Sequence, residues 1–211
     1  MKERRYVLFT RKKKKMNTFE YAHVPALLRT CYPIDVKLLR DEAERVRHHG
    51  VPSEHSDFPK EDYPKNIGWK MAKWTSSDGN NPIPRAIDIH LGDLINDMNL
   101  NKAERYSPRF YYLPALGGLP NHYDDNTTCG LNFLLVDDYV GVNIGGTMDG
   151  TVGGGKTTIK YSQGLLNTTL VHGVDNREHD AERILLKFSI FGTNFLKMCD
   201  LIPDKYKEGD I

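Results

Sequence analysis

The chain has few cysteines, no long apolar run and almost no net charge, and each shortage excludes a class of protein. Three cysteines in 211 residues (Cys31, Cys129 and Cys199) are odd in number and far apart. They make no disulfide framework and favour a reducing compartment. No run approaches the roughly 20 apolar residues of a membrane-spanning helix, and no signal-peptide core follows the N-terminus. A formal net charge of +1 favours no particular partner. These features predict a cytoplasmic protein.

The basic character that exists is concentrated at the N-terminus, where residues 1–16 include the run Lys12–Lys15. A nucleic acid or an acidic partner is one interpretation of this segment. A solvated terminus is the other, and it is favoured because short basic termini are common.

Composition and pattern divide a single domain into four segments. Residues 1–32 form the basic extension, 33–104 a supporting region, 105–192 a strand-rich core and 193–211 a C-terminal tail. The length suits one hydrophobic core.

Two amphipathic helices are expected in the supporting region. Asp35 gives a start signal and Gly50 a stop signal, and the apolar residues between them fall on one stripe. A second helix is expected from about Arg85 to Met98. Helices followed by strands predict an α+β, mainly β arrangement, with the helices packed on one face of a sheet.

A metal site is predicted from three residues in the strand-rich core. His122 and Asp124 are two positions apart, and His172 follows the strand-like run 165–171. Residues i and i+2 of a strand point to one face, so His122 and Asp124 should converge. Two imidazoles and a carboxylate suit Fe(II) and leave coordination positions open. Asp125 competes with Asp124, because a bulge or turn would reverse the choice.

This pattern resembles the Fe(II)- and 2-oxoglutarate-dependent dioxygenases. Their signature is His-x-Asp, a second histidine about fifty residues on, and then a basic residue about ten positions later. Here the histidines His122 and His172 are 50 positions apart, and Arg183 follows His172 by 11. The resemblance covers about residues 105–192, and is strongest to small prolyl and aspartyl/asparaginyl hydroxylases, including many encoded by phages. It implies a double-stranded β-helix (jelly-roll, cupin-like) core that uses Fe(II), dioxygen and 2-oxoglutarate to oxidise a substrate, releasing succinate and carbon dioxide.

The last long strand-like run contains the expected cosubstrate anchor. Arg183, Lys187 and Ser189 share one face of it, and the opposite face is apolar. A buried cation is costly without an anion, and the distal carboxylate of 2-oxoglutarate is an anion that guanidinium binds with two hydrogen bonds. Arg183 is the expected anchor, with Ser189 as a second contact and Lys187 as the alternative anchor. Tyr112 is expected to line the pocket.

A competing motif lies between the two halves of the metal signature. Residues 150–157 match the phosphate-binding loop G-x-x-x-x-G-K-[ST], ending in Lys156 and Thr157. That mechanism needs a helix after the loop, whereas residues 158–164 are β-prone and end at glycine. A hairpin between two strands is therefore the favoured interpretation.

Three functions follow, in decreasing order of support. The first is a dioxygenase that hydroxylates a protein side chain, an amino acid or another small molecule. The second is a non-catalytic jelly roll with a binding or structural role, and the third is a nucleotide-binding protein. The sequence does not select a substrate, because this fold hosts many chemistries.

Overall fold

The computed structural model describes residues 25–49, 51–52, 70–73, 83–148, 152 and 155–208. The basic N-terminal segment, considered above as a contact for an acidic partner, lies outside these residues.

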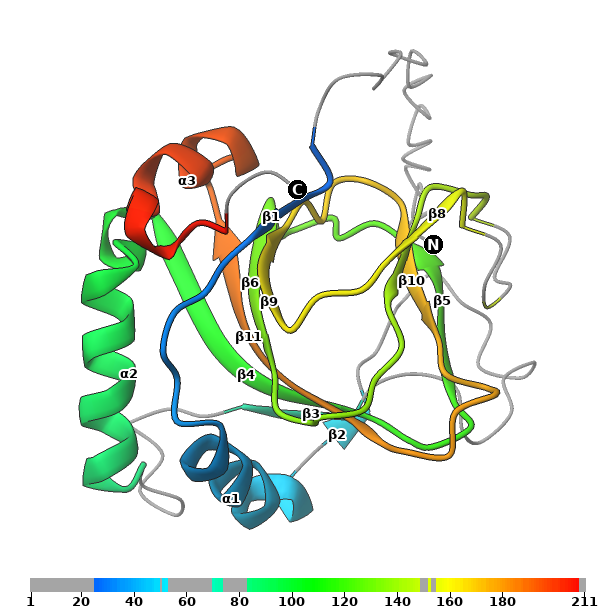
Figure 1. Cartoon of the computed structure of the whole chain (residues 1–211), viewed down its shortest axis with the longest axis horizontal. Helices are drawn as coiled ribbons and strands as arrows, with labels where there is room; N and C mark the ends of the chain where they lie inside the picture. Colours follow the sequence, from blue (N-terminus) through cyan, green and yellow to red (C-terminus); the bar gives the residue numbers. More distant parts are fainter. Residues whose placement is uncertain are drawn as a thin grey trace, which may run out of the picture.

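Two antiparallel β-sheets face each other and form the body of the molecule (Figure 1). The larger sheet consists of β1 (Leu27–Arg29), β2 (Val51–Pro52), β3 (Lys70–Lys73), β4 (Arg105–Leu113), β6 (Cys129–Leu134), β9 (Gln163–Leu166) and β11 (Arg183–Phe191). Its strand order is β1-β9-β6-β11-β4-β3-β2. The smaller sheet consists of β5 (Gly118–His122), β7 (Val142–Ile144), β8 (Thr157–Ile159) and β10 (His172–Asp175). Its order is β5-β10-β7-β8, and the two-sheet arrangement confirms the predicted jelly-roll core.

Strand β11 lies at the centre of the larger sheet and separates two hydrophobic cores. It pairs with β4 over its whole length and with β6 on its other side. One face packs with the helices through Ile184, Leu186, Phe188 and Ile190. The other face points toward the smaller sheet, where Leu185 joins Leu113, Leu119, Leu134, Val142, Tyr161, Leu166 and Val174. The alternation read from the sequence is therefore confirmed along this strand.

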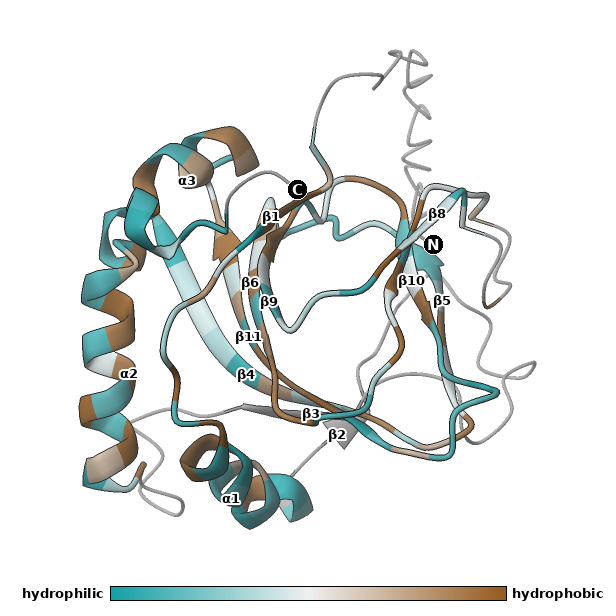
Figure 2. Cartoon of the chain, viewed as in Figure 1, coloured by the Kyte–Doolittle hydropathy of each residue, from teal (hydrophilic) through white to brown (hydrophobic). Residues whose placement is uncertain are grey.

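The two predicted helices cover the outer face of the larger sheet, as expected, and a third helix that the sequence did not predict packs into the same core. Helix α1 (Val36–Val46) begins after Asp35, whose carboxylate accepts a hydrogen bond from the Leu38 amide at 2.9 Å. Helix α2 is Arg85–Asp97 and α3 is Phe195–Leu201, and short 3₁₀ turns span Arg47–His49, Leu100–Lys102 and Asp204–Tyr206. Figure 2 shows apolar and polar residues interleaved along α1 and α2, as expected of helices with one buried stripe. None of the helices in the described ranges is long and apolar enough to cross a membrane.

Both ends of the described chain belong to the folded body. Strand β1, within the predicted extension, pairs with β9. Within the predicted C-terminal tail, α3 buries Phe195 and Met198, and the Cys31 amide donates to the Tyr206 carbonyl at 3.0 Å. Neither segment is long enough to show a periodic pattern, so the sequence did not reveal these contacts.

Candidate metal centre

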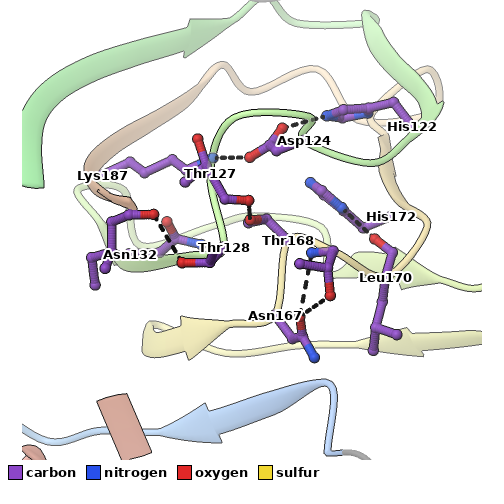
Figure 3. Close-up of polar contacts among 12 residues, drawn as sticks. His122, Asp124, Thr127, Thr128, Asn132, Asn167, Thr168, Leu170, His172 and Lys187 are labelled. Carbon is purple, nitrogen blue, oxygen red and sulfur yellow. Dashed lines mark hydrogen bonds and ion pairs between the residues drawn. The ribbon is translucent and has the colours of Figure 1, made fainter. Parts of the chain in front are cut away.

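Two histidines and an aspartate meet where β5 and β10 run side by side. His122 is the last residue of β5, His172 is the first of β10, and the antiparallel register places them directly opposite each other. His172 therefore begins a strand, whereas the sequence predicted it at the end of one. Asp124 lies two residues beyond β5. One ligand atom from each residue lies within 4.8 Å of the others, and Figure 3 shows the three side chains converging.

Both imidazoles are held in the orientation that a metal ligand needs. Nδ1 of His122 lies 2.8 Å from the Pro120 carbonyl oxygen, and Nδ1 of His172 lies 2.9 Å from that of Leu170. A carbonyl oxygen only accepts, so each Nδ1 is the protonated donor and each Nε2 keeps its lone pair in the neutral ring. The same local device, a bond to the carbonyl two residues earlier, thus prepares both rings for coordination through Nε2.

Hydrogen bonds tie the loop that carries Asp124 to the segment before His172. The Asp124 amide donates to the Thr168 carbonyl at 2.9 Å. The Thr168 hydroxyl donates back to the Thr127 carbonyl at 2.9 Å. Asn167 accepts from the Thr169 hydroxyl at 2.7 Å and so stabilises the turn (Figure 3). The two ligand-bearing segments are therefore held together by their backbones as well as by strand pairing.

The Asp124 carboxylate lies between the ammonium of Lys187 and the imidazole of His122. Its Oδ2 is 2.9 Å from Nζ of Lys187, and its Oδ1 is 3.6 Å from Nε2 of His122. Burial alone would raise the pKa of Asp124, but Lys187 and the two imidazoles outweigh burial and hold that pKa well below its ordinary value. Burial likewise lowers the pKa of Lys187, but Asp124, Tyr111 and Tyr161 together outweigh burial and raise that pKa above its ordinary value. Asp125 is exposed, so the geometry favours Asp124 as the ligand.

These donors fit a divalent transition metal such as Fe(II). Nitrogen and carboxylate ligands on one side of the ion leave its other coordination positions open. His122 and His172 are each only 5% exposed, so the surrounding protein limits access of water. The three side chains therefore have the ligand types and the convergence that such an ion needs, and both imidazole rings have the required orientation.

Arg183 provides a buried cation between the two sheets. It is 2% exposed, its guanidinium donates to the Val140 carbonyl, and its Nε has no hydrogen-bond partner. Burial lowers the pKa of Arg183, and Tyr161 and Tyr139 oppose that shift. No carboxylate of the described segments contributes to its electrostatic surroundings. A desolvated guanidinium with a spare donor is suited to binding an anion.

Two polar residues that the sequence did not single out lie near Arg183 and Lys187. The Asn132 amide donates to the Tyr161 hydroxyl at 2.8 Å, and its own Oδ1 has no partner. Asn132 is paired with Lys187 across β6 and β11, and Tyr161 raises the pKa of both cations. Nothing in the local sequence marks either residue, because their proximity depends on how distant strands pair.

The structure does not bring Tyr112 to this space. Tyr112 pairs with Ile184 and shares its face, so the Tyr112 hydroxyl donates to the Ala43 carbonyl of α1 at 2.5 Å. Strand alternation turns the preceding residue inward instead: Nζ of Lys187 lies 5.8 Å from the centre of the Tyr111 ring. The expectation that Tyr112 lines the pocket is therefore corrected: Tyr112 faces the helices, and Tyr111 lies on the inner face.

Ser189 shares the inner face with Arg183 but lies at the other end of the site. They lie six positions apart in an extended strand, which is about 20 Å between Cα atoms. The Lys187 side chain crosses Gly130, the residue opposite Ser189. Ser189 therefore lies at the Lys187 end of the site. It is too far from Arg183 for the two side chains to bind the same carboxylate.

The phosphate-loop interpretation fails at its required helix. Thr157 begins β8, which pairs antiparallel with β7 through residues 157–159. Residues 150, 151, 153 and 154 of the loop lie outside the described ranges. A strand offers no helix N-terminus to hold a phosphate, so the antiparallel pairing of β7 and β8 supports the favoured hairpin interpretation over the nucleotide-binding alternative.

Comparison with known proteins gives a structural likeness and no sequence relative. No family model and no curated protein matches the chain. A prolyl-4-hydroxylase from Pseudomonas putida superposes with a TM-score of 0.52 at 16% identity, over 76% of this chain and 88% of that one. A Trichoplax adhaerens prolyl hydroxylase, in complex with a hypoxia inducible factor peptide fragment, gives 0.49 at 13% identity, over 78% and 82%. A C-terminally truncated protein from Neurospora crassa, in apo form, gives 0.40 at 12%, over 76% and 80%. The likeness to the Pseudomonas putida protein confirms the fold.

Proposed function

We propose that this chain is a non-haem Fe(II)- and 2-oxoglutarate-dependent dioxygenase that hydroxylates its substrate. The observation that carries the proposal is the convergence of His122, Asp124 and His172 within 4.8 Å on a prolyl-hydroxylase fold. The overall reaction consumes dioxygen and 2-oxoglutarate. One oxygen atom enters a substrate C–H bond, the other enters succinate, and carbon dioxide is released.

The three ligands hold Fe(II), which supplies activation of dioxygen when it is bound. The contribution of the protein is geometric and electrostatic. The carbonyls of Pro120 and Leu170 fix both imidazole rings, and the buried surroundings keep the ligands in place before the metal arrives.

Arg183 binds the distal carboxylate of 2-oxoglutarate in this proposal. The support is its burial, its spare Nε donor and its lack of an acidic neighbour in the described segments. A carboxylate placed there would satisfy the donor and offset the cost of the buried charge. Lys187 is the alternative anchor, although its ammonium is already paired with Asp124.

The substrate class proposed is a protein side chain, an amino acid or another small molecule. Fold alone does not choose among these, because related folds serve many substrates.

The decisive experiment measures succinate formed from 2-oxoglutarate by the whole protein under air, with and without Fe(II). Pools of peptides, free amino acids and small metabolites are added separately, and His172→Ala is the matched control. Iron-dependent succinate release that exceeds the His172→Ala background is expected, with stimulation by one pool. A protein that binds metal but forms no succinate with any pool would instead be a non-catalytic jelly roll.

A further inference from the structure

Lys187 and Asp124 form a nearly buried ion pair inside the candidate metal centre. Nζ lies 2.9 Å from Oδ2, and the two side chains are 13% and 16% exposed. Figure 3 shows Lys187 reaching Asp124 from the side opposite the imidazoles. The path crosses Gly130, where a Cβ atom would lie 2.6 Å from Cε of Lys187. The absence of a side chain at Gly130 therefore leaves room for the lysine to extend to the carboxylate.

This ion pair alters what a metal ion meets at the site. Asp124 is the only anion of the ligand set, because the other two members are imidazoles. Its charge is already balanced by the ammonium of Lys187. A divalent cation bound to Asp124 would lie close to that ammonium, where little water screens the repulsion between them. Lys187 therefore lowers the affinity of the site for a metal ion, even though it fixes the position of the Asp124 carboxylate.

Positive charge accumulates further along the same face of β11. Arg183 is a second buried cation on that face, and no described acidic residue offsets it. With a metal bound, the inner space would hold a divalent ion, an ammonium and a guanidinium against a single carboxylate. An anionic cosubstrate that enters this space reduces the excess positive charge.

We propose that Lys187 weakens binding of the metal alone and so strengthens the dependence of metal binding on the anionic cosubstrate; this rests on the proposed function. The metal binds weakly while Lys187 is the nearest charge, and it binds tightly once 2-oxoglutarate is present. By linkage, the metal strengthens binding of 2-oxoglutarate by the same factor. Lys187 acts through its charge beside Asp124 and is not itself a ligand of the metal.

A lysine that only orients Asp124 would have the opposite effect on the metal. In that case a neutral replacement would leave the carboxylate misplaced and weaken metal binding. Charge opposition instead predicts that a neutral replacement strengthens metal binding in the absence of cosubstrate. The sign of one affinity change therefore distinguishes the two roles.

The test is anaerobic calorimetric titration with Mn(II), which does not turn over, with and without saturating 2-oxoglutarate. The whole protein is compared with Lys187→Met and Lys187→Arg. In the wild type, 2-oxoglutarate should tighten Mn(II) binding by about tenfold or more. Lys187→Met should bind Mn(II) alone about tenfold more tightly. 2-Oxoglutarate should then tighten that binding by a smaller factor than in the wild type. Lys187→Arg keeps the charge and should retain the coupling.

Lys187→Gln provides a second neutral variant should Lys187→Met fold poorly, and circular dichroism of each variant is recorded. Unchanged or weaker Mn(II) binding in a folded neutral variant, with wild-type 2-oxoglutarate binding intact, would overturn the coupling alone. Failure of the wild type to bind 2-oxoglutarate in the presence of Mn(II) would overturn both the coupling and the proposed function.

Discussion

His122 and His172 stand directly opposite each other on β5 and β10, with ring centroids 4.4 Å apart. They are 50 residues apart in the chain, and strand pairing alone brings them together. Since each ring also hydrogen-bonds to the carbonyl two residues before it, the local backbone fixes the orientation of both rings. The ligand set is thus preorganised by backbone structure.

Replacement of His172 by alanine should remove metal binding and leave the protein folded. His172 lies at a strand end, and its ring contributes a ligand more than it contributes apolar packing. Mn(II) affinity should fall by at least about 100-fold, because even residues that merely orient a ligand contribute about 10–100-fold. Calorimetry gives the affinity, and circular dichroism verifies the fold. His48→Ala, an exposed histidine on the surface, is the control, and equal losses in both variants would exclude His172 as a ligand.

Replacement of Arg183 by methionine should weaken 2-oxoglutarate binding by about 10–100-fold, the range expected for loss of charge-assisted hydrogen bonds. Arg183→Lys should recover part of the affinity. Arg177→Met is the matched control, since Arg177 is exposed and paired with Asp175 at 2.8 Å. The measurement is titration of 2-oxoglutarate in the presence of Mn(II). Unchanged affinity for 2-oxoglutarate in the Arg183 variants would indicate that Lys187 is the anchor instead.

Replacement of Tyr112 by phenylalanine should cost stability and leave cosubstrate binding unchanged. The variant loses the hydrogen bond to the Ala43 carbonyl, which contributes about 1 kcal/mol to the free energy of unfolding. Urea unfolding measures the stability, and 2-oxoglutarate titration measures the binding. Weaker cosubstrate binding in this variant would contradict the placement of Tyr112 on the helix side of the sheet.

Replacement of Gly173 by alanine should disturb the metal centre from within the smaller sheet. A Cβ atom there would lie 2.8 Å from the Leu119 carbonyl oxygen and 2.7 Å from Oδ1 of Asn121. Because backbone cannot yield as a flexible side chain can, β5 and β10 must separate, and His122 with them. Lower stability and weaker Mn(II) binding are expected together. Gly92→Ala, where a Cβ meets nothing within 4 Å, should affect neither.

The three cysteines should react with an alkylating reagent at different rates at the same alkaline pH. Burial raises the pKa of Cys129 to about 12 and that of Cys199 to about 11, whereas Cys31 is exposed. When the folded-state pKa of a thiol is above the unfolded value of about 8.5, its contribution to the free energy of unfolding is fully present below the unfolded pKa. That contribution is lost as the pH rises toward the folded-state pKa. At pH 9, iodoacetamide should therefore label Cys31 rapidly and Cys129 only after unfolding, as followed by mass spectrometry. Rapid labelling of native Cys129 would contradict its burial.

Local sequence signals predicted much of the architecture correctly. The cap at Asp35 located α1, and strict alternation located β11 and its two faces. These signals succeed because a cap bond and strand alternation depend on residues close together in the chain. Short strands such as β1 and β8 carried too few residues to show a period.

The sequence by itself determined the ligand types, their spacing and the presence of a basic residue on an inward strand face. The tertiary structure decided between Asp124 and Asp125, turned Tyr112 toward α1, and placed Lys187 on the Asp124 carboxylate. Those outcomes depend on which strands pair, in which register and across which distance. Such relations join residues tens of positions apart, and no local pattern along the chain encodes them.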